Sequence, residues 1–296
     1  MQTLSKRALL EWCAIPADEL TTHPARRIPF RMVEDRTEMG RVMAREFVDA
    51  VVQAQHEGRN FRMILPCGPM AWMEPFARIV NADKVSLRNL EVFHMDECLD
   101  WQGLEISRDH PYSFRGTMER EFYGAIDAAL LPAVEQRHWL TPDTCAAMSA
   151  ELIENPADLA YGGWGQDGHV AYNQARRNPF SEISVDDLRN STARIQDNNV
   201  DTIIALSQRT LGGAYQFVPP MSVTLGMREI LAARRVRLFS DTGAWKQTAL
   251  RVALFGDPTA EYPVTLLQGH PDAMLTATKE TAQHPISLNP GWVTAL

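Results

Sequence analysis

Cysteine and positive charge are both scarce in this sequence of 296 residues. The four cysteines lie far apart, without metal-motif spacing or the density of a disulfide framework, so we expect free thiols and a cytoplasmic location. Aspartate and glutamate number 37 against 29 lysines and arginines, which argues against binding of nucleic acid through its phosphates. An anionic ligand must therefore be met by a local group of positive charges.

Long hydrophobic runs are missing as well. The apolar stretch at 8–10 is interrupted by Glu11 before it reaches the length of a signal-peptide core, and no segment approaches transmembrane length. The sequence therefore predicts no association with a membrane. With 45% hydrophobic and 22% charged residues, the composition is typical of a globular protein.

Apolar residues recur with two different periods along the chain. Between Asp35 and Ala54 they follow helical spacing, and Asp35 with Glu38 has the spacing of a capping box. Helical segments are also expected after 141–143 and over 244–254. Short apolar runs predict strands at 61–65, 90–95, 159–161, 222–225, 236–239 and 273–276. This alternation predicts an α/β fold with a mostly parallel sheet covered on both faces.

Two acidic residues, Asp96 and Glu97, directly follow the strand predicted at 90–95. Ligands of open α/β sheets bind outside the carboxyl ends of the strands. These two acids are therefore better candidates for a functional site than acids on a helix surface.

A glycine-rich stretch follows the strand predicted at 159–161. Gly163-x-Gly165-x-x-Gly168 has the form of a dinucleotide-binding fingerprint, but that motif usually opens the first strand-helix unit and has many false positives. Here its variable positions hold Asp167, and His169 follows. An Asp-Gly-His turn favours acid/base chemistry, because two titratable side chains can converge on one region. The alternative, that both side chains merely satisfy a buried loop, stays open.

The polar stretch at 176–215 has only weak periodicity. Arg176 and Arg177 lie at its start. Two interpretations remain open: a mobile cover over the site, or a solvated surface helix with loops.

Five blocks together resemble the glucosamine-6-phosphate deaminases, in which they occur in the same order. The blocks lie at 65–68, 93–97, 110–114, 163–173 and 222–227. The resemblance runs from about residue 36 to about 278, which suggests an N-terminal extension at 1–34 and a single catalytic domain at 35–296. The block at 163–173 favours the deaminases over the related 6-phosphogluconolactonases.

This resemblance implies a Rossmann-like three-layer α/β/α fold and a reaction on a sugar phosphate without cofactor or metal. In the family the sugar ring is opened, a carboxylate moves a proton between C2 and C1, and water releases ammonia from the imine. Asp96 matches the carboxylate. His169 matches the residue that passes the proton at the ring oxygen, and Asp167 matches its orienting partner.

The resemblance also implies residues that contact the substrate. They are Cys67, Gly68, Glu97, Gly165, Asn173, Arg194 and Lys246. Arg194 and Lys246 resemble the phosphate-binding cations, although surface salt bridges are an open alternative for both. The phosphate loop itself departs from the family, because Cys67-Gly68-Pro69-Met70 lacks the hydroxyl donors of a Thr-Gly-x-Thr sequence. Gln174 is a second departure, since it replaces a catalytic glutamate beside the histidine.

These departures keep two other functions open. One is hydrolysis of a sugar lactone, and the other is a sugar-phosphate sensor without turnover. Residues 1–34 show no helix-turn-helix pattern that would make such a sensor a DNA-binding regulator. Metal binding by His94, Asp96, Glu97 and His169 is not expected, because their spacing fits no metal motif. Family members also form homo-oligomers, which one chain cannot predict.

Overall fold

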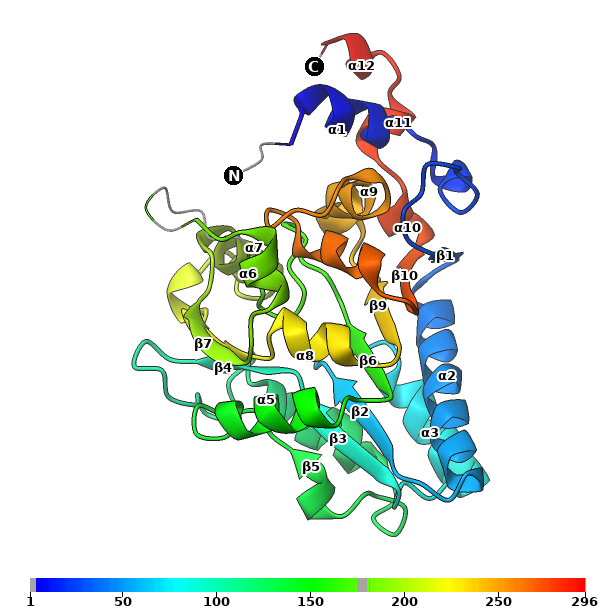
Figure 1. Ribbon diagram of the computed structural model, residues 1–296, viewed down its shortest axis with the longest axis vertical. Coiled ribbons are helices and arrows are strands. Elements are labelled where there is room, and N and C mark those ends of the chain that lie inside the picture. Colours follow the sequence, from blue (N-terminus) through cyan, green and yellow to red (C-terminus); the bar gives the residue numbers. More distant parts are fainter. Residues whose placement is uncertain (1–3, 175–179, 181, 296) are drawn as a thin grey trace.

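A seven-stranded parallel sheet forms the centre of the protein in a computed structural model, which describes residues 4–174, 180 and 182–295 (Figure 1). The strand order is β1-β10-β9-β6-β2-β3-β5. The strands are β1 (Phe30–Val33), β2 (Phe61–Leu65), β3 (Leu90–His94), β5 (Arg137–His138), β6 (Leu159–Gly162), β9 (Val236–Ser240) and β10 (Ala273–Thr278). Every strand predicted within this sheet is confirmed.

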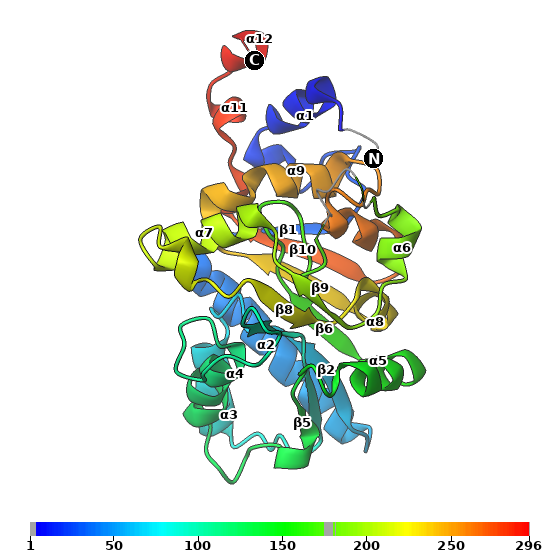
Figure 2. The same ribbon diagram turned by 90° about the vertical axis from the view of Figure 1, so that its left-hand side faces the viewer.

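Helices cover both faces of the sheet, as the two views show (Figures 1 and 2). Phe61, Met63 and Leu65 of β2 pack in one core cluster with α2 (Arg36–His56) and α3 (Met73–Asp83). Ile64 faces the opposite core cluster, because successive side chains of a strand point to opposite faces. That second cluster includes α5 (Cys145–Glu154), α8 (Met227–Ala232) and α9 (Gln247–Phe255). The predicted three-layer α/β/α fold is confirmed.

A second, antiparallel sheet of three strands lies beside the carboxyl end of β3. It consists of β4 (Asp96–Leu99), β8 (Met221–Thr224) and β7 (Arg194–Asp197), in that order. The strand predicted at 222–225 therefore exists, but it pairs with β4 and β7 instead of joining the parallel sheet. Only Met95 separates β3 from β4, so Asp96 stands at the junction of the two sheets.

The N-terminal segment contributes to the core as well. β1 pairs with β10 at the edge of the parallel sheet, and Leu20 and Ile28 are fully or almost fully buried. Helix α1 (Lys6–Cys13) contacts α9. The boundary suggested at residue 35 therefore falls after the first strand of the sheet.

The remaining helices are short. They are α4 (Phe114–Thr117), continued by a π-helical turn at Met118–Phe122, α6 (Val185–Arg189), α7 (Val200–Thr210), α10 (Lys279–Ala282), α11 (Pro285–Leu288) and α12 (Trp292–Ala295). The helix expected after 141–143 is α5, which begins only at Cys145. Of the helices that the structure describes, none has the length and hydrophobicity needed to cross a bilayer.

Candidate active site

A cavity of about 390 Å³ lies at the carboxyl ends of the parallel strands. Its walls come from the segments that follow β1, β2, β3, β6 and β9, with a further contribution from α7. This is the place where open α/β sheets bind ligands, and the volume lies within the range of small-molecule sites. Six of the predicted site residues line it: Cys67, Gly68, Asp96, Gly165, His169 and Lys246.

His169 and Asp167 form a tight pair in the loop after β6. Nδ1 of His169 lies 2.6 Å from Oδ1 of Asp167, whose side chain is almost fully buried behind the histidine. Burial alone would raise the pKa of Asp167, but the adjacent His169 and its hydrogen bonds lower it to about 2. The ionised carboxylate accepts a hydrogen bond from Nδ1–H, which leaves Nε2 of His169 as the ring nitrogen available to a ligand.

The absence of a side chain at Gly165 leaves the space that the imidazole ring of His169 occupies. A Cβ added to Gly165 would lie 2.1 Å from Cε1 of His169, closer than any real contact. The backbone N–H of Gly165 also donates to the carbonyl of His169 over 2.9 Å. The glycine therefore has a steric role beneath the ring, at the position where the sequence predicted a substrate contact.

Asp96 enters the cavity from the junction between β3 and β4. Burial raises the pKa of Asp96 to about 8, and the neighbouring Glu97 carboxylate adds to the increase. A carboxyl group with a pKa near neutrality can both take up and release a proton at physiological pH. Asp96 therefore lies in the cavity, and its raised pKa is consistent with the proton-transfer role that the sequence predicted.

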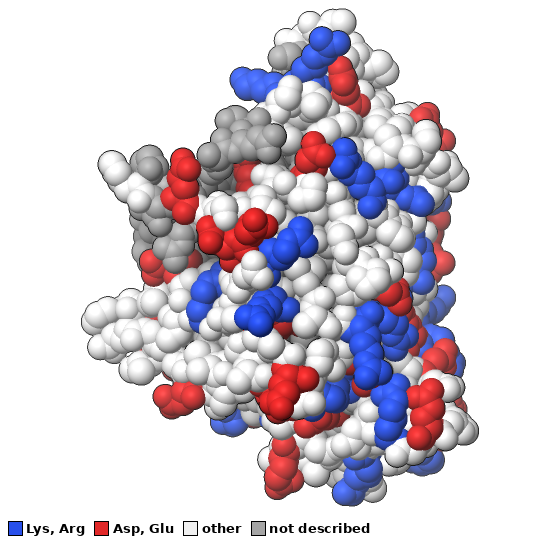
Figure 3. Space-filling model, viewed as in Figure 1, with Lys and Arg blue, Asp and Glu red and all other residues white. Residues whose placement is uncertain are grey.

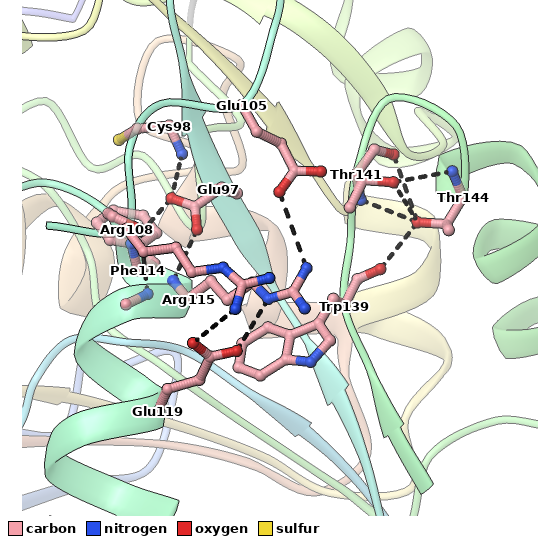
Figure 4. A network of polar contacts seen from close by, with 12 residues as sticks. Glu97, Cys98, Glu105, Arg108, Phe114, Arg115, Glu119, Trp139, Thr141 and Thr144 are labelled. Atoms are coloured by element: carbon pink, nitrogen blue, oxygen red, sulfur yellow. Dashed lines mark hydrogen bonds and ion pairs between the residues drawn. The ribbon is translucent and has the colours of Figure 1, made fainter. Parts of the chain in front are cut away.

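Glu97, in contrast, does not line the cavity, and its predicted contact with substrate is not supported. Its carboxylate accepts hydrogen bonds from the backbone N–H groups of Cys98, Phe114 and Arg115 at 2.8, 2.8 and 2.6 Å (Figure 4). These bonds join β4 to the start of α4, because the first N–H groups of a helix lack partners within the helix. Glu97 is a structural residue that fixes this corner.

Asn173 and Arg194 are the other predicted substrate contacts that lie outside the cavity wall. Asn173 is fully buried and donates from Nδ2 to the carbonyls of Val170 and Leu225 at 3.0 and 2.8 Å. Arg194 donates to Oδ1 of Asn173 over 2.9 Å. Both side chains thus hold the loop after β6 against the second sheet, and the predicted phosphate-binding role of Arg194 has no support in the structure.

The cavity contains cations that the sequence did not reveal. Arg209 of α7 and Arg36 of α2 both line it, together with the predicted Lys246. Burial, aided by Arg209, lowers the pKa of Lys246 to about 8, while Asp241 acts in the opposite direction. The polar stretch at 176–215 thus supplies an arginine to the site through α7, which favours its interpretation as a cover. Arg176 and Arg177 themselves lie outside the described residues.

Buried polar atoms without partners mark the loop after β6. Within the described part of the chain, Nε2 of Gln166, Oδ2 of Asp167 and Nε1 of Trp164 are buried and have no hydrogen-bond partner. Gln166 and Trp164 line the cavity. A buried polar atom without a partner destabilises the folded state unless a ligand or a water molecule forms the missing hydrogen bond.

Several known proteins that are similar to this chain in sequence share one name. No family model matches the sequence. The glucosamine-6-phosphate deaminase of Vibrio cholerae serotype O1 is 30% identical over 234 residues, which are 76% of this chain and 80% of the relative. That of Caenorhabditis elegans is 29% identical over 256 residues, 83% of this chain and 88% of the relative. The chain belongs to the glucosamine-6-phosphate deaminase family.

Solved structures agree with this family fold. A monomeric glucosamine-6-phosphate deaminase superposes with a TM-score of 0.72 at 19% identity, covering 86% of this chain and 98% of that protein. The 6-phosphogluconolactonase of Trypanosoma cruzi gives a TM-score of 0.59 at 17% identity, over 86% and 95% of the two chains. At these identities the comparison concerns the fold alone.

Two other interpretations of the site's motifs find no support in this family member. The described part of the glycine-rich loop forms turns and isolated bridges after β6, whereas a dinucleotide fingerprint opens a helix. His94 stacks on Trp139 at 3.7 Å between ring centroids and lies 3.0 Å from the Tyr123 hydroxyl. Among the described residues, no three His, Cys, Asp or Glu side chains are grouped to hold a metal ion.

A larger groove, of about 890 Å³, runs along α2. It contains none of the predicted site residues, and its wall mixes arginines such as Arg41 and Arg45 with Glu38, Glu46 and Asp49. Figure 3 likewise shows basic and acidic side chains interleaved over the face that it draws. The groove therefore lacks the converging acid/base groups of the cavity.

Proposed function

We propose that this protein is an aldose-ketose isomerase/deaminase that acts on an amino-sugar phosphate such as glucosamine 6-phosphate. The observation that carries the proposal is the presence of Asp96 and His169 in one cavity, with cations at the same cavity wall. Family membership supports the same reaction, because the relatives are named for it.

In this mechanism the Asp167–His169 pair opens the sugar ring. Because Nδ1 of His169 is directed at Asp167, Nε2 takes the proton of the anomeric hydroxyl and returns it to the ring oxygen. Asp167 keeps the imidazole ring of His169 oriented and stabilises the positive charge that the imidazole carries during the proton transfer.

Asp96 then acts on the open-chain sugar. Its carboxylate removes the proton from C2 and delivers it to C1, which converts the 2-amino aldose into a ketose imine. Water hydrolyses the imine to a ketose and ammonia. The raised pKa of Asp96 suits this step, since the same group must first accept the proton and then release it.

The test is ammonia release from 2-amino sugars with and without a 6-phosphate, using the wild type beside Asp96→Asn. We expect ammonia from a phosphorylated sugar, and a turnover at least roughly 100-fold lower in the variant, as is usual for loss of a general base. Near-normal turnover by a folded Asp96→Asn protein would exclude Asp96 as the proton carrier.

A second candidate is hydrolysis of a sugar lactone, which the shared fold of the 6-phosphogluconolactonase supports. The same assay separates the two reactions, since a lactonase releases acid without ammonia. Binding of sugar phosphate with neither product would instead indicate a sensor.

A further inference from the structure

Four charged side chains meet in one part of the cavity: Arg36, Arg209, Lys246 and Asp241. Nε of Arg36 lies 3.3 Å from Oδ2 of Asp241, and both Arg209 and Asp241 act electrostatically on Lys246. Three cations against one carboxylate leave a net charge of +2. This matches the charge of a phosphate monoester, which is about −2 at neutral pH.

The side chains of the loop after β2 offer this phosphate neither a hydroxyl donor nor a positive charge. Its residues Cys67, Gly68, Pro69 and Met70 carry no hydroxyl group and no charge, and Pro69 has no backbone N–H. Burial raises the pKa of the Cys67 thiol, which keeps that side chain neutral. The positive charge that an anion beside this loop requires must therefore come from side chains of other elements.

Arg36 stands in an unusual place for a positive charge. It is the first residue of the 21-residue helix α2, where the helix dipole disfavours a cation. Its side chain is 66% exposed, whereas that of Asp241 is only 6% exposed. Since one partner is largely in solvent, the pair adds little stability and exchanges readily for a stronger anion.

We infer that Arg36 is a specificity-determining residue that binds the substrate phosphate in place of the missing hydroxyl donors. Asp241 is its counter-ion in the free protein, and the phosphate takes over the guanidinium when substrate binds. Arginine suits this exchange because its planar guanidinium offers two parallel N–H donors to phosphate oxygens. The inference rests on the proposed phosphorylated substrate and identifies the residue that selects it.

The experiment compares Arg36→Gln with Arg45→Gln, a change of an exposed arginine on the same helix that pairs with Asp49 at 3.8 Å. Calorimetry measures binding of glucosamine 6-phosphate, glucosamine and inorganic phosphate, and ammonia release gives KM and kcat. We expect Arg36→Gln to weaken binding of both phosphate compounds by roughly tenfold or more and to raise KM with little change in kcat. Arg45→Gln should leave phosphate binding, KM and kcat at their wild-type values. Neither variant should change the binding of glucosamine.

Asp241→Asn provides an independent check. Because the carboxylate competes with phosphate for Arg36, its removal should tighten binding of inorganic phosphate several-fold. If Asp241→Asn binds phosphate as tightly as the wild type or more weakly, the inferred exchange of Asp241 for phosphate is wrong. It is also wrong if Arg36→Gln and Arg45→Gln bind phosphate equally well.

The calorimetry also separates this inference from the proposed reaction. If the wild type releases no ammonia but Arg36 still governs phosphate binding, the reaction is wrong and the phosphate site stands. If ammonia is released and phosphate binding does not depend on Arg36, the reaction stands and the role of Arg36 is refuted.

Discussion

The side-chain nitrogen Nε2 of Gln174 lies 3.3 Å from Nδ1 of His169. Its amide orientation is fixed, because the backbone N–H of Asn199 donates to Oε1 over 2.9 Å and Nε2 donates to Thr202 over 2.6 Å. The N–H at Nδ1 already donates a hydrogen bond to Asp167, so this N–H and the amide N–H of Gln174 are two donors that face each other. Gln174 therefore places the partial positive charge of its N–H group beside the histidine ring.

Gln174→Glu should reverse this effect. A carboxylate of the same size can keep the bond from Asn199 and accept one from the Thr202 hydroxyl, so the fold should tolerate it. The negative charge stabilises the positive charge that the imidazole gains while it carries the substrate proton, so ammonia release at a fixed pH should be several-fold faster than in the wild type. A rate identical to that of the wild type would show that the contact has no electrostatic effect.

Asp96 should control the acidic side of the pH–rate profile. With a pKa of about 8 in the free protein, only about a tenth of the carboxyl is ionised at pH 7 and able to act as a base. We expect kcat/KM to rise about tenfold per pH unit below pH 8, and to fall again above pH 8 as Lys246 loses its charge. Rates measured from pH 5.5 to 9 give this limb, and a midpoint near the ordinary pKa of aspartate would contradict it.

Asp96→Asn should also make the protein more stable. The folded state raises the pKa of Asp96 above its ordinary value of 3.8, so stability is lost as pH rises from about 4 to about 8. The amide removes that loss. The melting temperatures of the two proteins should therefore diverge between pH 5 and pH 8, with the variant melting at the higher temperature. Parallel curves of melting temperature against pH would contradict a raised pKa of Asp96 in the folded protein.

Lys246 should limit phosphate binding on the alkaline side. Its pKa of about 8 means that the ammonium loses its charge as pH rises through this value. KM for a phosphorylated substrate should then increase above pH 8 while kcat is less affected. In Lys246→Met the KM should be high at every pH and should not increase further above pH 8. If the increase persists in this variant, titration of Lys246 is not its cause.

Glu97→Ala tests a structural role. The change leaves three backbone N–H groups without their acceptor, and we expect a loss of about 3 kcal/mol in the free energy of unfolding. Glu105→Ala, a partly exposed carboxylate 3.9 Å from Arg115 in the same network, should change stability by less than about 0.5 kcal/mol. Urea denaturation measures both, and equal effects would refute the role assigned to Glu97.

The sequence predicted those parts of the molecule that depend on local pattern. Helix α2 and the strand before Asp96 follow from periodicity, and Asp167 and His169 are neighbours in one turn. Contacts between distant segments left no such pattern. Arg36 and Arg209 stand in separate helices, and only the folded sheet brings them to one cavity. For the same reason a motif alone could not show that Arg194 is bonded to Asn173.

The two-sheet arrangement around Asp96 also bears on how the protein folds. The cavity wall draws on segments from Arg36 to Lys246, which follow five parallel strands whose pairing partners are distant in sequence. Pairing of this kind is slow, because chain entropy is lost before the contacts form. The site is therefore complete only after the sheet has assembled. A ligand that binds there should leave the refolding rate unchanged and slow unfolding instead.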